Sequence, residues 1–259
     1  MKKILLPVAI VLVFFACNQK PKQYAKNADV LADNLNGHVQ QTVSTDYKVD
    51  SSGNIGDRDS CCIVTAKYDE KGYITEFDTD DKAGENKQKE TFQHDDNGAM
   101  KDLKNTKNGK VESTISIEID SAGNYKIARE YDSTNKLKFI YTDIKQNDYG
   151  QLTGMKKFTA DSILNGTMVS NFNNSIFTGN EERDSTGKII YSSTVKLDDK
   201  NNVIERDTKN VTNDSTINNV VKYKYDSFDD HGNWTQRTEM DENGKPVKIT
   251  KREITYYKE

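Results

Sequence analysis

The chain has 259 residues, of which 34% are hydrophobic and 30% are charged, and its formal net charge is −4. Acidic and basic residues are interspersed, and the lack of a basic stripe excludes the electrostatic footprint of a nucleic-acid-binding protein. Thirteen tyrosines, nine phenylalanines and regular turn signals argue against disorder, which a low apolar content otherwise favours. We therefore expect a thin sheet that is apolar on one face and wet over much of the other.

The first residues have the pattern of a secretory leader. Lys2 and Lys3 precede an apolar run from Ile4 to Ala16, and these 13 residues are too few to span a bilayer as a helix. Ala16 directly before Cys17 resembles a bacterial lipobox, although an ordinary signal peptide with a chance cysteine remains the alternative. We expect residues 1–16 to be a lipoprotein signal peptide and Cys17 to carry the lipid anchor, so that the membrane is a partner.

Residues 17–34 follow as the lipidated cysteine and a polar tether, with a short helical turn expected near Ala28 to Leu35. No acidic residue directly follows Cys17. Among lipoproteins with such a lipobox, an acidic cluster at this place commonly directs surface display. Its absence favours an anchor on the periplasm-facing side of the outer membrane over exposure at the cell surface.

The rest of the chain, residues 35–259, is predicted to form one repetitive domain built on a four-residue turn. In Asp229 to Gly232, the aspartate is expected to accept hydrogen bonds from N–H groups two and three residues on, and the glycine to supply a positive φ. The same device, sometimes with Asn in the glycine or aspartate position, recurs at 50–53, 69–72, 95–98, 120–123, 132–135, 147–150, 184–187, 198–201 and 241–244. Such regular recurrence predicts many hairpins in succession.

Between these turns, apolar residues alternate with period two, as in Ile115, Ile117 and Ile119. The predicted fold is all-β: an extended antiparallel meander of repeated hairpins that forms a curved single sheet. Polar stretches at 78–89 and 207–215 are predicted as loops. A barrel spanning the outer membrane is not expected, because outward positions carry Lys, Glu and Asp where lipid requires an apolar band.

A resemblance supports this architecture. Tyr225 and Asp226, followed by Asp230, Gly232 and Asn233-Trp234, resemble the YD (RHS-type) repeat, and the segments beginning at Tyr68 and Tyr131 resemble weaker copies. The chain is most similar to small Bacteroidota-type envelope lipoproteins with degenerate YD-like repeats. The resemblance implies antiparallel sheets that wrap or curve, and it says almost nothing about activity.

Aromatic residues near the C-terminus form the candidate binding surface for a protein or glycan partner; they are Tyr223, Tyr225, Trp234, Tyr256 and Tyr257. The alternative is that these rings pack on the sheet face and stabilise it. Cys61 and Cys62 are adjacent, but no further ligands complete a metal set around them. The three histidines lack a nucleophile motif, and the acidic run from Asp78 does not fit a calcium loop.

We therefore predict no cofactor, no metal and no catalytic residue. The leading hypothesis is a non-catalytic envelope lipoprotein that presents a sheet surface to a protein or glycan. A periplasmic carrier or chaperone for an apolar ligand is the first alternative, and an envelope hydrolase is the second.

Overall fold

The computed structural model describes residues 24–50, 53–81, 85–212 and 215–258. In this part of the chain, one short helix, α1 (Asp29–Ala32), precedes sixteen antiparallel strands. The strands are β1 (Val39–Val49), β2 (Ile55–Tyr68), β3 (Ile74–Asp80), β4 (Lys87–His94), β5 (Met100–Lys107), β6 (Lys110–Ile119), β7 (Tyr125–Asp132), β8 (Leu137–Gln146), β9 (Leu152–Thr159), β10 (Leu164–Asn173), β11 (Ile176–Asp184), β12 (Ile189–Leu197), β13 (Val203–Val211), β14 (Thr216–Phe228), β15 (Trp234–Met240) and β16 (Pro246–Tyr256).

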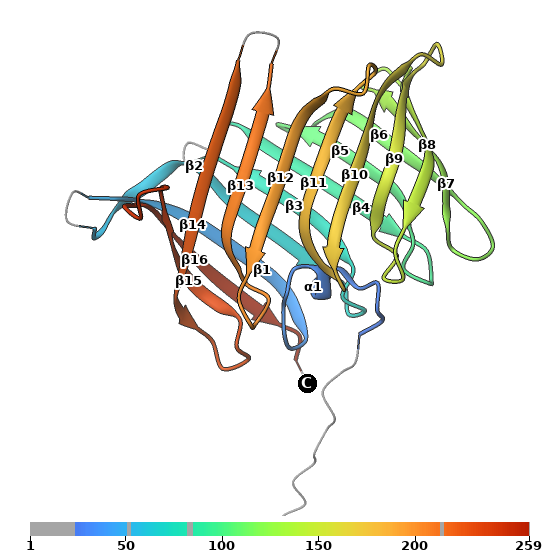
Figure 1. Cartoon of the computed structure of the whole chain (residues 1–259). Coiled ribbons are helices and arrows are strands. Elements are labelled where there is room, and N and C mark those ends of the chain that lie inside the picture. The colour runs from blue at the N-terminus through green and yellow to red at the C-terminus, as the bar shows by residue number, and fades with distance from the viewer. Residues whose placement is uncertain (1–23, 51–52, 82–84, 213–214, 259) are drawn as a thin grey trace, which may run out of the picture.

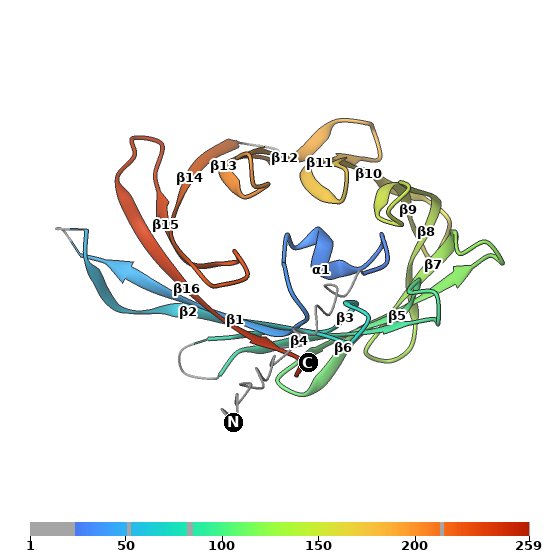
Figure 2. The same ribbon diagram turned by 90° about the horizontal axis from the view of Figure 1, so that it is seen from below.

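The sheet closes into a barrel. Each strand pairs with the next in sequence, and β1 pairs with β16 from Val39 opposite Tyr256 to Lys48 opposite Lys248 (Figures 1 and 2). The prediction of a curved, open single sheet is therefore wrong. Turn signals specify only which strands are neighbours in sequence, whereas closure depends on a pairing between the two ends of the domain.

The four-residue turns form the hairpins, as predicted. In the turn between β2 and β3, the Gly72 N–H donates to the Asp69 carbonyl at 2.9 Å. The Asp69 carboxylate accepts the N–H groups of Lys71 and Tyr73 at 2.8 and 3.0 Å, so the contacts fall two and four residues on instead of two and three. Asn135 and Asn201 take the glycine position with φ of 62° and 63°.

Two polar stretches predicted as loops are partly strand. Strand β3 continues to Asp80 and β4 begins at Lys87, while β13 continues to Val211. The outward side chains of these segments contact each other across strands, as Lys89 Nζ does with Glu76 at 3.0 Å. Outward strand positions need no apolar residue. The polar composition of these two stretches therefore did not show where the strands end.

Ion pairs lie around the outer wall of the barrel. Lys67 with Glu76, Lys156 with Asp143 and Lys196 with Glu205 are each 2.7 Å apart, and their chain neighbours point to the interior. A wall embedded in hydrocarbon carries an apolar band at such positions. At these positions the described outer wall carries charged pairs instead. Within the described residues, none of the helical structure is long and apolar enough to traverse a bilayer.

The inner segment, residues 24–38, lies within one end of the barrel (Figure 2). Hairpin turns at that end hold it: Val30 N–H donates to the Gly72 carbonyl at 3.1 Å, and Asn34 Nδ2 donates to the Lys200 carbonyl at 3.0 Å. Asn233 exchanges two hydrogen bonds of 2.8 Å with the backbone of Asn36. Val30 is fully buried in the main apolar cluster, so the hydrophobic core lies between this segment and the walls of β1 to β3.

Candidate ligand-binding site in the barrel interior

A cavity of about 480 Å³ lies between the end of α1 and the interior faces of strands from both ends of the domain. We call it the arginine pocket, and its principal side chains are Arg206, Tyr223, Tyr225, Trp234, Arg237 and Arg252. Strand register brings them together, because β15 pairs with both β14 and β16 and places Arg237 opposite Tyr225 on one side and Thr250 on the other.

Trp234 contacts two arginines. The guanidinium carbon of Arg252 lies 3.7 Å from the indole centroid, and that of Arg237 lies 4.8 Å from it. Arg237 also lies 4.7 Å from the Tyr223 ring, and Arg252 Nε donates to the Trp234 carbonyl at 3.0 Å. Cation–π contacts of this kind hold the guanidinium groups against the rings.

The pocket has an excess of positive charge. Among the described residues, Arg206, Arg237 and Arg252 form no ion pair with a carboxylate, and Arg237 Nε and Arg252 Nη2 are buried without a hydrogen-bond partner. Burial and the nearby charge of Arg237 lower the pKa of Arg252 to about 10. Asp33 also lines the pocket, but burial raises the pKa of its carboxyl, and it accepts the Tyr68 hydroxyl.

The five aromatic residues singled out in the sequence separate into two groups. Tyr223, Tyr225 and Trp234 line the arginine pocket together. Tyr256 instead lies outside it, where its hydroxyl contacts Asp229 and its ring lies 4.2 Å from that of His231. Tyr257 donates its hydroxyl to the Tyr68 carbonyl at 2.7 Å.

The arginines of this pocket were missed by the sequence analysis. Their phase along the strands places Arg237 and Arg252 inward, but the same inward rows also hold Glu239, Lys248 and Thr250, so phase alone did not single them out. A charged residue in such a row is costly unless it is paired or binds something.

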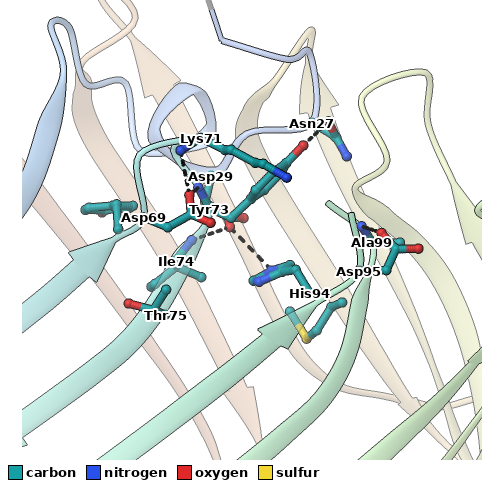
Figure 3. Close-up of polar contacts among 12 residues, drawn as sticks. Asn27, Asp29, Asp69, Lys71, Tyr73, Ile74, Thr75, His94, Asp95 and Ala99 are labelled. Atoms are coloured by element: carbon teal, nitrogen blue, oxygen red, sulfur yellow. Dashed lines mark hydrogen bonds and ion pairs between the residues drawn. The ribbon is translucent and has the colours of Figure 1, made fainter. Parts of the chain in front are cut away.

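A second interior cavity of about 510 Å³ lies on the other side of α1. Figure 3 shows Asp29 from α1 reaching the wall, where it accepts the Ile74 N–H at 2.7 Å and lies 3.8 Å from His94 Nε2. Burial raises the pKa of Asp29 to about 7 and lowers the pKa of His94, which favours the neutral form of each. Tyr73 stacks on His94 with centroids 5.2 Å apart and donates to Asn27 Oδ1 at 3.0 Å. These contacts fasten the inner segment to the wall.

A third cavity of about 250 Å³ lies against the interior faces of β5 to β9. Its lining, taken from the described residues, contains no charged side chain and includes Leu103, Ile115, Ile117, Ala128, Ile144 and Met155. We call it the apolar pocket.

Other candidate sites are not supported by the described residues. Within them, no three His, Cys, Asp or Glu side chains gather in a way that would hold a metal ion. Cys17 lies outside the described residues, and so do the side chains of Cys61 and Cys62.

Comparison with solved structures shows the class of fold, a closed antiparallel barrel. A porin-like protein from Bacteroides uniformis is similar with a TM-score of 0.52 at 12% identity, covering 84% of this chain and 98% of that chain. A porin-like protein from Bacteroides vulgatus (TM-score 0.34, 10% identity, 85% and 99% covered) and a Tc holotoxin pore from Photorhabdus luminescens (TM-score 0.33, 15% identity, 82% and 11% covered) are too dissimilar to carry an argument. No family model matches the sequence, and no curated protein does.

Proposed function

We propose that this chain is a non-catalytic cell-envelope protein, anchored by lipid at Cys17, whose barrel binds a glycan in the arginine pocket. The observation that carries the proposal is that Tyr223, Tyr225 and Trp234 line one interior cavity of about 480 Å³. Aromatic rings beside hydrogen-bonding side chains in a concave site are typical of ligand binding. The expected sheet surface is replaced by the barrel interior, because the outer wall is covered with ion pairs.

The anchor fixes how the barrel would lie at the membrane. Six residues lie between Cys17 and Tyr24, the first described residue, and the seven residue-to-residue steps span at most about 25 Å. Tyr24 belongs to the inner segment, so the end of the barrel that holds α1 would stay close to the bilayer. The charged wall would then remain in water, on the periplasm-facing side of the outer membrane.

The anchor is tested with Cys17→Ser. We expect the variant to leave the membrane fraction and appear in the soluble fraction after cell lysis, while the unaltered chain stays with membranes. Continued membrane retention of the variant would contradict lipidation at this position.

Ligand binding is tested with the fluorescence of Trp234, the single tryptophan of the chain. The full chain, purified in mild detergent, is titrated with a panel of neutral and acidic oligosaccharides. We expect a saturable change in emission that weakens in Tyr223→Ala and persists in Tyr257→Phe, which lies outside the pocket. If no sugar in the panel produces a saturable change, the proposal fails.

A carrier for an apolar ligand is the second candidate, and the apolar pocket favours it. Its volume of about 250 Å³ suits part of an acyl chain. We expect native mass spectrometry to show bound palmitate in the unaltered chain and in Arg237→Gln. Met155→Glu, which places a charge in the lining, should abolish that binding; equal binding by this variant would exclude the pocket as the site.

A further inference from the structure

Two kinds of cation lie on the inward positions of the barrel, and they differ in their partners. Lys248 Nζ lies 3.1 Å from Asp46 and 3.1 Å from Glu239, so its charge is balanced by the wall itself. Arg237 and Arg252 have no such carboxylate among the described residues. A cation that serves only the fold is normally paired in this way, since an unpaired buried charge is costly.

Arg237 and Arg252 have N–H donors without a partner among the described residues. A guanidinium has five N–H donors. Arg252 uses one on the Trp234 carbonyl, and two nitrogens, Arg237 Nε and Arg252 Nη2, are buried without any partner in the described residues. Arg237 also shares a hydrogen bond with the Tyr225 side chain, and Asp33 is near enough to act on the charge of Arg252. The two side chains still bring two cations and two unpartnered nitrogens to one cavity.

The contacts of Trp234 with the two arginines also limit what can bind. Arg237 and Arg252 both lie over the Trp234 ring, so cations already occupy ring surface that the ring of a neutral sugar would need. The same contacts restrict the movement of the guanidinium groups, and a planar guanidinium fork suits a carboxylate or phosphate through two parallel hydrogen bonds. A neutral ligand would leave both charges uncompensated.

From these contacts we propose that the ligand of the arginine pocket carries an oxyanion, the carboxylate of an acidic sugar or the phosphate of a phosphorylated sugar, which Arg237 and Arg252 bind. This inference rests on the proposed function and names the class of its ligand. Arg206, which lines the same cavity, adds a third positive charge. The remaining aromatic faces, on Tyr223 and Tyr225, contact the sugar.

The experiment compares galacturonic acid, galactose 6-phosphate and galactose, added separately to the full chain in mild detergent and followed by Trp234 emission. We expect one or both acidic sugars to bind at least tenfold more tightly than galactose, with affinity falling as salt rises. Whichever acidic sugar binds more tightly identifies the carboxylate or the phosphate as the group recognised. Galactose binding as tightly as both acidic sugars would overturn the inference and leave the proposed function standing. No binding by any of the three would also overturn the inference, and the proposed function falls with it if the oligosaccharide panel gives no saturable change either.

Variants locate the site. Arg237→Gln and Arg252→Gln should each weaken binding of the tighter acidic sugar at least tenfold, while Lys251→Gln, which removes a charge from the outward position beside Arg252, should not. Circular dichroism confirms that each variant is folded. Arg237→Lys serves as a second variant that keeps the charge and loses the planar fork, and it should also weaken binding. Unchanged affinity in Arg237→Gln, or in Arg237→Lys if the glutamine variant does not fold, would overturn the assignment.

Discussion

The Asp29 carboxylate accepts the backbone N–H of Ile74 at 2.7 Å, which joins the short helix inside the barrel to the first residue of β3 in the wall. Val30, the next residue, donates its own N–H to the Gly72 carbonyl of the preceding turn at 3.1 Å. The inner segment therefore completes the hydrogen bonding at the end of the β2–β3 hairpin. It also divides the interior into the arginine pocket and the cavity around His94.

Asp29 should make the stability of the chain pH-dependent. Burial raises its pKa from 3.8 to about 7 in the folded state, so between these values the folded chain binds more protons than the unfolded one. Stability contributed by Asp29 is thus full below about pH 4 and falls as the pH rises to about 7. Because 33% of the side chain is exposed, solvent weakens the effect. Asparagine in Asp29→Asn cannot ionise. The melting temperature of the unaltered chain should therefore fall more from pH 5 to pH 8 than that of the variant. Equal falls in the melting temperature of the two chains would contradict this account.

Removal of Val30 volume should loosen the inner segment. The side chain is fully buried in the apolar cluster, and Val30→Ala should lower the free energy of unfolding by about 2 kcal/mol through lost burial and a residual cavity. Ile163 is 65% exposed, and its replacement by alanine should change stability by less than about 0.5 kcal/mol. Urea denaturation measures the free energy of unfolding of both variants. Equal losses would show that the inner segment does not add to the hydrophobic core.

Two glycines with the same backbone conformation should differ in their tolerance of alanine. Gly98 and Gly244 have φ of 84° and 80°, so alanine at either position costs about 1 kcal/mol in backbone strain. At Gly98 an added Cβ would lie 1.9 Å from the Tyr73 ring, whereas at Gly244 nothing lies within 4 Å. Gly98→Ala should therefore destabilise the chain by at least about 1 kcal/mol more than Gly244→Ala, because overpacking adds to the strain. Similar midpoints in urea would contradict the packing of Tyr73 against this turn.

Lysines inside the barrel and on its outer wall should contribute unequally to the stability of the chain. Lys248→Met leaves Asp46 and Glu239 facing each other in the barrel interior and should cost about 2 kcal/mol. Lys196 pairs with Glu205 on the outer wall with 71% of its side chain exposed, so solvent screens the pair and Lys196→Met should cost much less than Lys248→Met. Thermal unfolding at low and high salt compares them, and a larger loss in Lys196→Met would be inconsistent with the assigned faces.

Closure of the barrel can be tested with an engineered disulfide. Val43 of β1 lies opposite Glu253 of β16, so Val43→Cys with Glu253→Cys should form an intramolecular bond, detected by peptide mass spectrometry after mild oxidation. Val43→Cys with Lys209→Cys, which places the second cysteine on β13, should not. If neither pair crosslinks within one chain, β1 and β16 do not lie side by side.

Local chemistry made part of this structure predictable. The turn from Asp69 to Gly72 needs only an acceptor and a residue with positive φ, both visible in the sequence, and Ile115 and Ile117 of the alternating row do line one cavity. Tyr223, Tyr225 and Trp234 could be selected as a group for the same reason, since they lie in one hairpin. The part played by Arg237 and Arg252 was not predictable, because nothing in their local sequence shows that carboxylates are missing around them.

An all-β chain of successive hairpins follows from the amino-acid sequence alone, since each turn is encoded within four or five residues. Three further features emerge only when the chain is folded: the sheet closes, residues 24–38 fill one end of it, and the arginines meet on Trp234. Each of these depends on strand register between distant segments, such as Thr45 of β1 opposite Lys251 of β16. Register is fixed by the sum of many side-chain contacts across the whole barrel, and no short stretch of sequence contains that sum.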